Sequence, residues 1–137
     1  SPHDARAGWN WTFWRESLER LVRELSSTAL APALVAPASK LSVHTQPHSV
    51  DIEIATRQTA QFLYVFVVRR SGATSQIGIA GLPSTLKGGD VLFEYVQDPP
   101  PPPLAPANQK FRSIAVTGGA FRDWFAPYDA RVYRFRR

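Results

Sequence analysis

Cysteine and methionine are both absent from the 137 residues of this sequence. The lack of cysteine excludes disulfide bonds, thiolate zinc sites and a cysteine nucleophile. It does not identify the compartment, because many secreted enzymes also lack cysteine. The chain begins at Ser1 and has no methionine, so we expect an excised or processed piece of a longer protein.

Long apolar runs and familiar catalytic motifs are missing as well. No stretch approaches the roughly 18 apolar residues that a membrane span requires, and the N-terminal residues lack the basic-then-apolar order of a secretory signal. The sequence has no Gly-x-Ser-x-Gly elbow, no phosphate-binding glycine loop and no His-Glu-x-x-His motif. We therefore expect no membrane partner and no catalytic role, with a self-contained enzyme whose site is unrecognised kept as a third alternative.

The net charge of +5 permits an acidic partner such as nucleic acid, an anionic membrane surface or an acidic polysaccharide. The basic residues are nevertheless spread along the chain, and the densest groups are Arg69-Arg70 and the four arginines within residues 131–137. Solvated strand faces and a polar terminus explain these groups better than a nucleic-acid stripe does. We expect no nucleic-acid partner.

The length argues for one domain. Residues 1–10 carry no periodicity and are expected to form a flexible lead-in, and residues 11–137 a single domain. Apolar residues at spacings of three and four predict an amphipathic helix over residues 12–27. The heavy side chains Trp11 and Trp14 lie on its apolar stripe, which must pack against this domain or against a part of the protein that this chain does not include.

After residue 39 the hydrophobic period changes from that of a helix to two, as in β-strands. Seven segments follow this pattern, with turn residues such as Thr117–Ala120 between them: Lys40–Thr45, Val50–Arg57, Phe62–Arg69, Ser75–Leu82, Asp90–Gln97, Lys110–Thr117 and Ala130–Arg136. Phe62–Arg69 is apolar on both faces, as expected of a central strand. The predicted fold is all-β, an antiparallel β-sandwich of about eight strands with one N-terminal amphipathic helix.

Metal binding and acid–base chemistry find little support in the residue spacing. His44 and His48 flank a turn that contains Pro47, where an i,i+4 spacing does not bring two imidazoles together. The 11 acidic residues show no local spacing that predicts the facing carboxylates of a glycosidase. We expect no metal, no cofactor and no catalytic residue.

Carbohydrate binding is the sharper hypothesis, because aromatic rings stack on the apolar faces of sugar rings while polar groups bind the hydroxyls. Aromatic residues make up 12% of the chain, and two of them fall in a predicted loop rich in polar residues. The alternative is that Trp124-Phe125 caps the end of the sandwich and Tyr128 packs beneath it. The candidate carbohydrate-binding residues are Trp124, Tyr128, Arg122, Asp123, Asp129 and Trp9.

Three segments resemble the C-terminal β-sandwich of barrel-type glycoside hydrolases. The tail Phe121-x-Asp123-x-Phe125-Ala126-Pro127-Tyr128, followed by Val132-Tyr133-Arg134-Phe135, resembles the phrase that closes that sandwich, although Ala130-Arg131 stands where Val-His is usual. Leu18 to Leu34 resembles the last barrel helix running into the sandwich. Phe62–Arg69 resembles its central strand, with Arg69 in place of the usual Asn.

The resemblance implies a non-catalytic accessory domain, because the catalytic carboxylates of such enzymes lie on the barrel. It implies a polysaccharide or oligosaccharide as ligand and the catalytic barrel of the parent enzyme as partner. The parent would be an enzyme of a secreted or lysosomal type. The alternative is a purely structural sandwich that braces the barrel and binds no ligand, and fold analogy alone does not choose between the two.

Overall fold

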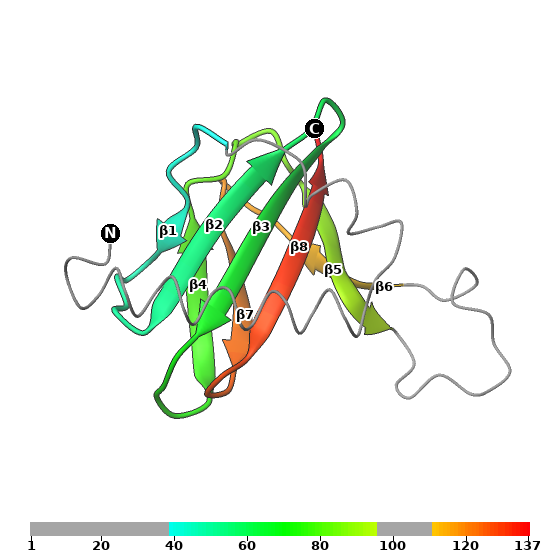
Figure 1. The fold of residues 1–137 in the computed structure, drawn as a ribbon. Coiled ribbons are helices and arrows are strands. Elements are labelled where there is room, and N and C mark those ends of the chain that lie inside the picture. Colours follow the sequence, from blue (N-terminus) through cyan, green and yellow to red (C-terminus); the bar gives the residue numbers. More distant parts are fainter. Residues whose placement is uncertain (1–38, 96–110) are drawn as a thin grey trace, which may run out of the picture.

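The computed structural model describes residues 39–95 and 111–137, which form two antiparallel β-sheets (Figure 1). The predicted lead-in, the predicted helix over residues 12–27 and the candidate residue Trp9 lie outside the described residues. Within the part that is described, no helix is long and apolar enough to cross a membrane.

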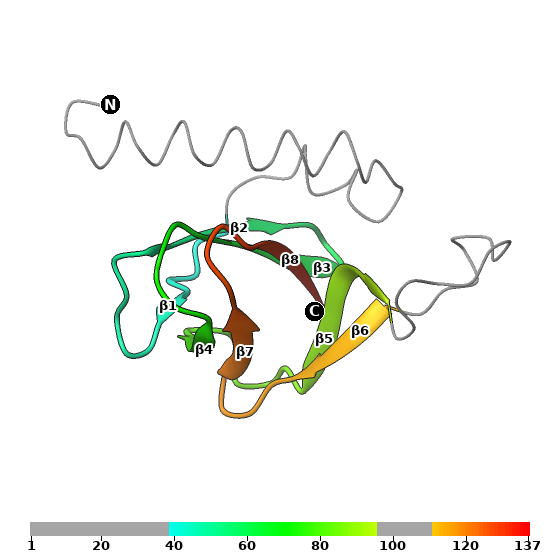
Figure 2. The ribbon, with the colours of Figure 1, turned by 90° about the horizontal axis from the view of Figure 1, so that it is seen from below.

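Eight strands make up the described fold, one more than the seven segments identified in the sequence. A three-stranded sheet has the order β1-β4-β7 and a five-stranded sheet the order β2-β3-β8-β5-β6. The two sheets face each other, and β5 and β6 continue the larger one around toward β7 (Figure 2). The strands are β1 (His44–Thr45), β2 (Ile52–Gln58), β3 (Phe62–Arg69), β4 (Ser75–Ala80), β5 (Gly88–Tyr95), β6 (Phe111–Ala115), β7 (Phe121–Phe125) and β8 (Ala130–Arg136). The all-β, sandwich-like prediction is confirmed at this level.

The hydrophobic core lies between the sheets and follows from the alternation within each strand. Side chains at every second position point inward, because successive residues of a strand face opposite sides. Phe121 of β7 packs against Tyr133 and Phe135 of β8, with ring centroids 4.7 and 5.7 Å apart. These rings join two strands that belong to different sheets, and they hold β7 over β8.

β3 is buried on both of its faces, as the sequence predicts for a central strand. Leu63, Val65 and Val67 point into the core between the sheets, whereas Tyr64 and Phe66 lie on the opposite face and are also buried. Strand β3 pairs with β2 on one side and with β8 on the other. Hydrogen bonds to two neighbouring strands and burial of both faces therefore fix the position of β3 in the fold.

The predicted hairpin turn is present between β6 and β7. Thr117 and Ala120 exchange two backbone hydrogen bonds of 2.9 and 3.1 Å. The two residues between them, Gly118 and Gly119, have φ values of 59° and 76°. Two consecutive positive φ angles are what a tight hairpin turn requires, and glycine adopts them without steric cost.

Most strand boundaries differ from those predicted by a few residues, and β1 is only two residues long. Strand β5 begins at Gly88, two residues before the predicted start at Asp90. More important for function, Phe121–Phe125 is strand β7 and not part of an aromatic loop. The sequence pattern does not reveal this strand, because it is only five residues long and one of its three inward positions holds the polar residue Asp123.

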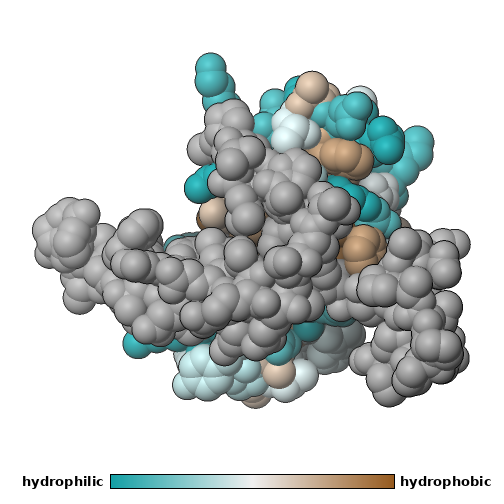
Figure 3. Space-filling model, turned by 45° about the vertical axis from the view of Figure 1, so that its right-hand side comes forward, coloured by the Kyte–Doolittle hydropathy of each residue, from teal (hydrophilic) through white to brown (hydrophobic). Residues whose placement is uncertain are grey.

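The described surface visible in Figure 3 is mainly hydrophilic, and the hydrophobic residues on it are scattered. Among the described residues, the large hydrophobic side chains that are exposed are those of Val50, Trp124 and Tyr128. Single exposed hydrophobic residues are common, but tryptophan is usually well buried. The exposure of Trp124 therefore needs an explanation.

Candidate functional site

Strand β7 presents two very different faces. Phe121, Asp123 and Phe125 are buried, whereas Arg122 and Trp124 are exposed. In the neighbouring strand β4, Ile79 is fully buried in the core, whereas Gln76, which pairs with Trp124, is exposed. Arg122 and Trp124 therefore lie on the outer face of the three-stranded sheet, the face directed away from the five-stranded sheet.

The cross-strand register places polar groups beside Trp124. Gln76 of β4 pairs with Trp124, and Gly78 pairs with Arg122. The Nε of Arg122 donates a hydrogen bond of 3.1 Å to the Oε1 of Gln76. We name Gln76, Arg122 and Trp124 the outer-face cluster. It combines an aromatic ring, an amide and a guanidinium on two hydrogen-bonded strands, which gives it a rigid base.

Gly78, which pairs with Arg122, leaves space for the neighbouring groups because it has no side chain. A Cβ at this position would lie 2.4 Å from the backbone oxygen of Gln46 and 3.3 Å from an Nη atom of Arg122. The lack of a side chain lets the guanidinium of Arg122 lie close to the sheet. The ring of Trp124 is 59% exposed on the same face.

The turn that follows β7 carries the second exposed aromatic residue. The N–H of Asp129 donates to the carbonyl of Ala126 over 3.2 Å, which closes a turn with Pro127 and Tyr128 at its centre. Tyr128 is 64% exposed and has a φ of 68°. Proline followed by a residue with positive φ is typical of a type II turn, whose second central position usually holds glycine. A tyrosine there is strained by on the order of 1 kcal/mol.

We expect the variant Tyr128→Gly to unfold with a free energy equal to that of the wild type or up to about 1 kcal/mol higher. Relief of the left-handed strain outweighs the entropy that glycine adds to the unfolded chain, which is about 0.4–1 kcal/mol. Urea denaturation measures the change, and Tyr128→Ala is the matched control because it removes the same exposed ring and keeps the strain. A glycine variant less stable than the alanine variant would contradict this account of the turn.

On the inner side of β7, Asp123 is the centre of a network of charges between the sheets. Its Oδ2 accepts hydrogen bonds from Tyr133 Oη at 2.7 Å and from Arg112 Nη2 at 2.8 Å. Its Oδ1 accepts from the backbone N–H of Trp124 at 3.0 Å. Arg131 Nη1 lies 3.3 Å from Oδ2. Glu94 joins the two arginines, with 2.9 Å to the Nε of each.

This network perturbs the pKa values of its members. Burial alone would raise the pKa of Asp123, but the hydrogen bonds from Arg112 and Tyr133 and the positive charge of Arg131 outweigh it and hold the pKa below its usual value. Burial, followed by the negative charge of Asp123, raises the pKa of the Tyr133 hydroxyl. A carboxylate that stays ionised between two arginines is unsuited to act as a general acid. The arrangement is that of a structural ion cluster.

The structure separates the five candidate residues that it describes. Arg122 and Trp124 share the outer face of the three-stranded sheet, and Tyr128 is exposed in the next turn. Asp123 is directed inward and is only 7% exposed, so in this fold its carboxylate is not accessible to a sugar at the outer face. The carboxylate of Asp129 accepts from the backbone N–H of Ala126 at 2.7 Å and from Arg131 at 3.1 Å. It stabilises the turn.

The sequence interpretation missed Gln76. Its neighbours Ile77 and Ile79 show that it lies on the polar face of a strand, but nothing local connects it with Trp124. That connection depends on the pairing of β4 with β7, whose closest residues are 40 or more positions apart in the chain.

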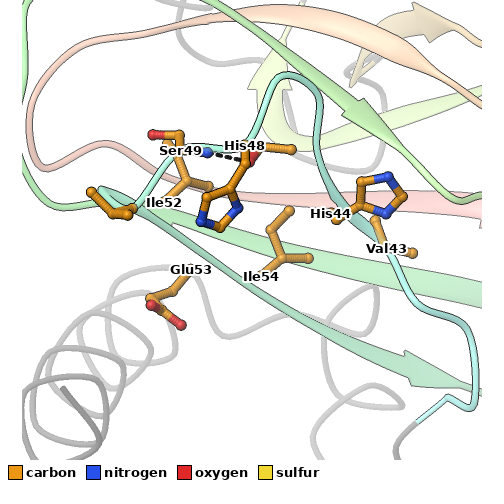
Figure 4. A pocket seen from close by; sticks show the side chains of 9 residues that line it. Val43, His44, His48, Ser49, Ile52, Glu53 and Ile54 are labelled. Carbon is orange, nitrogen blue, oxygen red and sulfur yellow. Dashed lines mark hydrogen bonds between the residues drawn. The ribbon is translucent and has the colours of Figure 1, made fainter.

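A small hollow lies between β1 and β2, with a volume of about 210 Å³ (Figure 4). His48 lies across it near Ile54, and His44 lies farther along the same side, whereas Glu53 is directed away from both. The hydroxyl of Thr45 accepts from the N–H of Ser49 at 2.8 Å. Small-molecule sites usually measure about 300–1,000 Å³. Within the described residues, no three potential metal ligands come together here or elsewhere.

Comparison with known proteins yields no protein-family model, no curated protein and no solved structure that matches this chain. The geometry of the outer-face cluster and its surroundings is therefore the basis for a functional inference.

Proposed function

We propose that this chain is a non-catalytic carbohydrate-binding domain whose sugar ligand stacks on Trp124. The observation that carries the proposal is the exposure of this ring on the outer face of a sheet, beside an amide and a guanidinium that are already joined by a hydrogen bond. The indole can cover the apolar face of a pyranose ring, and Gln76 and Arg122 can bind its hydroxyls. Tyr128 is a second exposed ring, four residues along the chain.

Two physical features support binding at this face. First, two paired strands hold the outer-face cluster, so little side-chain and backbone order has to be gained when a ligand binds. Second, Tyr128 occupies a position that glycine would fill without strain. Strained residues gather at functional sites, and an exposed tyrosine that costs stability is readily explained if its ring has a use.

The resemblance of the tail to the end of barrel-type glycoside hydrolases supports a place for this domain in a polysaccharide-active enzyme. In that setting the domain would hold the substrate near a catalytic barrel, and the chemistry would take place on the barrel. The strand that carries Trp124 belongs to the same stretch of sequence as the resemblance.

The second candidate is a structural sandwich that braces the barrel and binds nothing. One observation favours it: the hollow between β1 and β2, at about 210 Å³, is too small to enclose a sugar of several units. The two alternatives are therefore binding on the outer face and no binding at all. They differ in whether replacement of Trp124 changes the affinity for a polysaccharide.

Affinity electrophoresis of the full chain through gels that contain single polysaccharides separates the two. We expect at least one polysaccharide to retard the wild type. The affinity of Trp124→Ala for that polysaccharide should be lower by about tenfold or more, as expected for an aromatic residue central to an interface. Val50→Ala is the matched control, because it shortens another exposed hydrophobic side chain away from β7. Thermal unfolding verifies that each variant is folded.

The proposal fails if the folded wild type is retarded by no polysaccharide, and the bracing role then remains. It fails equally if a retarded wild type is matched by Trp124→Ala, because the binding face would then lie elsewhere.

A further inference from the structure

Arg122 of the outer-face cluster has a neutral side-chain partner, whereas three arginines of the five-stranded sheet are paired with carboxylates. Arg112, Arg131 and Arg134 each have a carboxylate within 3.0 Å, from Glu94, Asp123 or Asp90. Arg122 donates to the neutral Gln76. Within residues 39–95 and 111–137, no carboxylate forms an ion pair with Arg122.

The guanidinium of Arg122 is held in place and still has donors to spare. Its Nε is bound to Gln76, and its terminal nitrogens make no hydrogen bond within the part of the chain that the structure describes. A guanidinium presents its donors in a planar fork that matches a carboxylate or a sulfate group. Because Nε is already fixed, the fork loses little freedom when such a group binds.

The strand positions on the outer face of the three-stranded sheet, all of them within the described residues, hold no acidic side chain. The outer positions of the three strands, as the register defines them, hold His44, Gln76, Gly78, Ala80, Arg122 and Trp124. None of these residues is acidic. The outer face of the five-stranded sheet, by contrast, has Glu53 and Asp90 at outward positions of β2 and β5. Among the described strand positions of this face, no carboxylate competes with an anion for Arg122.

We infer that the ligand of this face is an acidic glycan, a polysaccharide whose sugar units carry carboxylate or sulfate groups. This inference rests on the proposed carbohydrate-binding function. A sugar ring stacks on Trp124, and its anionic substituent binds the guanidinium of Arg122. The net charge of +5 adds a general attraction for such polymers.

The test uses pairs of polysaccharides that share their sugar units and differ in charge. Polygalacturonate and its methyl ester test the carboxylate, and a sulfated galactan and its desulfated form test the sulfate. We expect the charged member of at least one pair to retard the full chain about tenfold more than its neutral partner, since charge-assisted hydrogen bonds are the stronger ones. Which pair shows the difference identifies the anionic group.

Two variants locate the effect. Arg122→Gln is expected to remove most of the preference for the charged polymer, and Arg122→Lys to keep part of it, because lysine retains the charge without the planar fork. Arg136→Gln is the matched control, since it lowers the net charge equally and changes an exposed arginine of the other sheet. Thermal unfolding again verifies the fold.

The inference is overturned if charged and neutral members are bound equally, or if Arg136→Gln weakens binding as much as Arg122→Gln does. In either case a loss of binding in Trp124→Ala leaves the carbohydrate-binding function standing. If the folded chain binds none of these polymers and no other polysaccharide, the proposed function itself has failed.

Discussion

Replacing Asp123 by asparagine is expected to lower the free energy of unfolding by about 3 kcal/mol at neutral pH, since the buried carboxylate is lost from an ion cluster whose two arginines then keep, among the described residues, only Glu94 and Asp129 as charged partners. The carboxylate is nearly inaccessible and accepts from Arg112, Tyr133 and the backbone of Trp124. Asparagine has the same shape and no charge, so the loss reports the ion cluster and not packing. Urea denaturation followed by fluorescence measures it.

The pH dependence of this loss has a definite sign. Because the folded pKa of Asp123 lies below the ordinary value of 3.8, its contribution is fully present above pH 3.8 and is lost as the pH falls through the lower folded pKa. The stability difference between wild type and Asp123→Asn should therefore be constant from neutral pH to about pH 5 and shrink in more acidic solution. A difference that grows on acidification would contradict the assignment.

The exposed pair of Asp90 and Arg134 supplies the control for Asp123. It has a comparable separation of 3.0 Å, but the Asp90 side chain is 41% exposed. Exposed ion pairs contribute about 0–1 kcal/mol, so Asp90→Asn should cost less than about 1 kcal/mol. Equal losses in the two variants would show that burial of the Asp123 cluster has no special effect.

Replacing Gly81 by alanine is expected to be comparably damaging, with a loss of about 3–5 kcal/mol in the free energy of unfolding. Its φ is 95°, a conformation that costs a side chain about 1–3 kcal/mol. In addition, a Cβ would lie 2.2 Å from the backbone oxygen of Ser42, so the chain leading into β1 must move. Overpacking of this kind adds about 1–3 kcal/mol.

The variant Gly118→Ala measures the cost of a positive φ angle alone, without the steric clash that Gly81→Ala adds. Gly118 also has a positive φ, of 59°, but no atom outside its immediate neighbours lies within 4 Å of a Cβ placed there. Its loss should be about 1–2 kcal/mol. If Gly118→Ala is as damaging as Gly81→Ala, the close approach of Ser42 to Gly81 contributes nothing, and the explanation of the larger loss is wrong. Thermal or urea unfolding of both variants decides.

The two faces of β7 differ in what they carry, a buried ion cluster on the inner face and the proposed binding residues on the outer face. The inward residue Asp123 organises the ion cluster, and the neighbouring outward residue Trp124 belongs to the outer-face cluster. The backbone N–H of Trp124 donates to Asp123, and the carbonyl of Trp124 accepts from Arg131. The buried network therefore holds the backbone on which the exposed ring stands. Asp123→Asn tests the inner face and Trp124→Ala the outer one.

The sequence by itself determined the class of the fold. Alternation with a period of two predicts strands because successive side chains of a strand point to opposite faces, and this is a local property. The apolar Phe62–Arg69 identified a central strand, and Thr117–Ala120 identified a hairpin, since Gly118-Gly119 supplies two positive φ angles. The sequence also marked Trp124, Tyr128 and Arg122 as residues able to bind a sugar.

Only the tertiary structure decided which of these residues share a surface. Strand β7 pairs with β4, so Gln76 comes to lie beside Trp124 although the two residues are 48 positions apart in the sequence. The same pairing turns Asp123 toward two arginines of the other sheet and away from the outer-face cluster. Long-range strand pairing depends on the packing of the whole core and leaves no trace in the spacing of neighbouring residues, which is why the site could be located only once the fold was known.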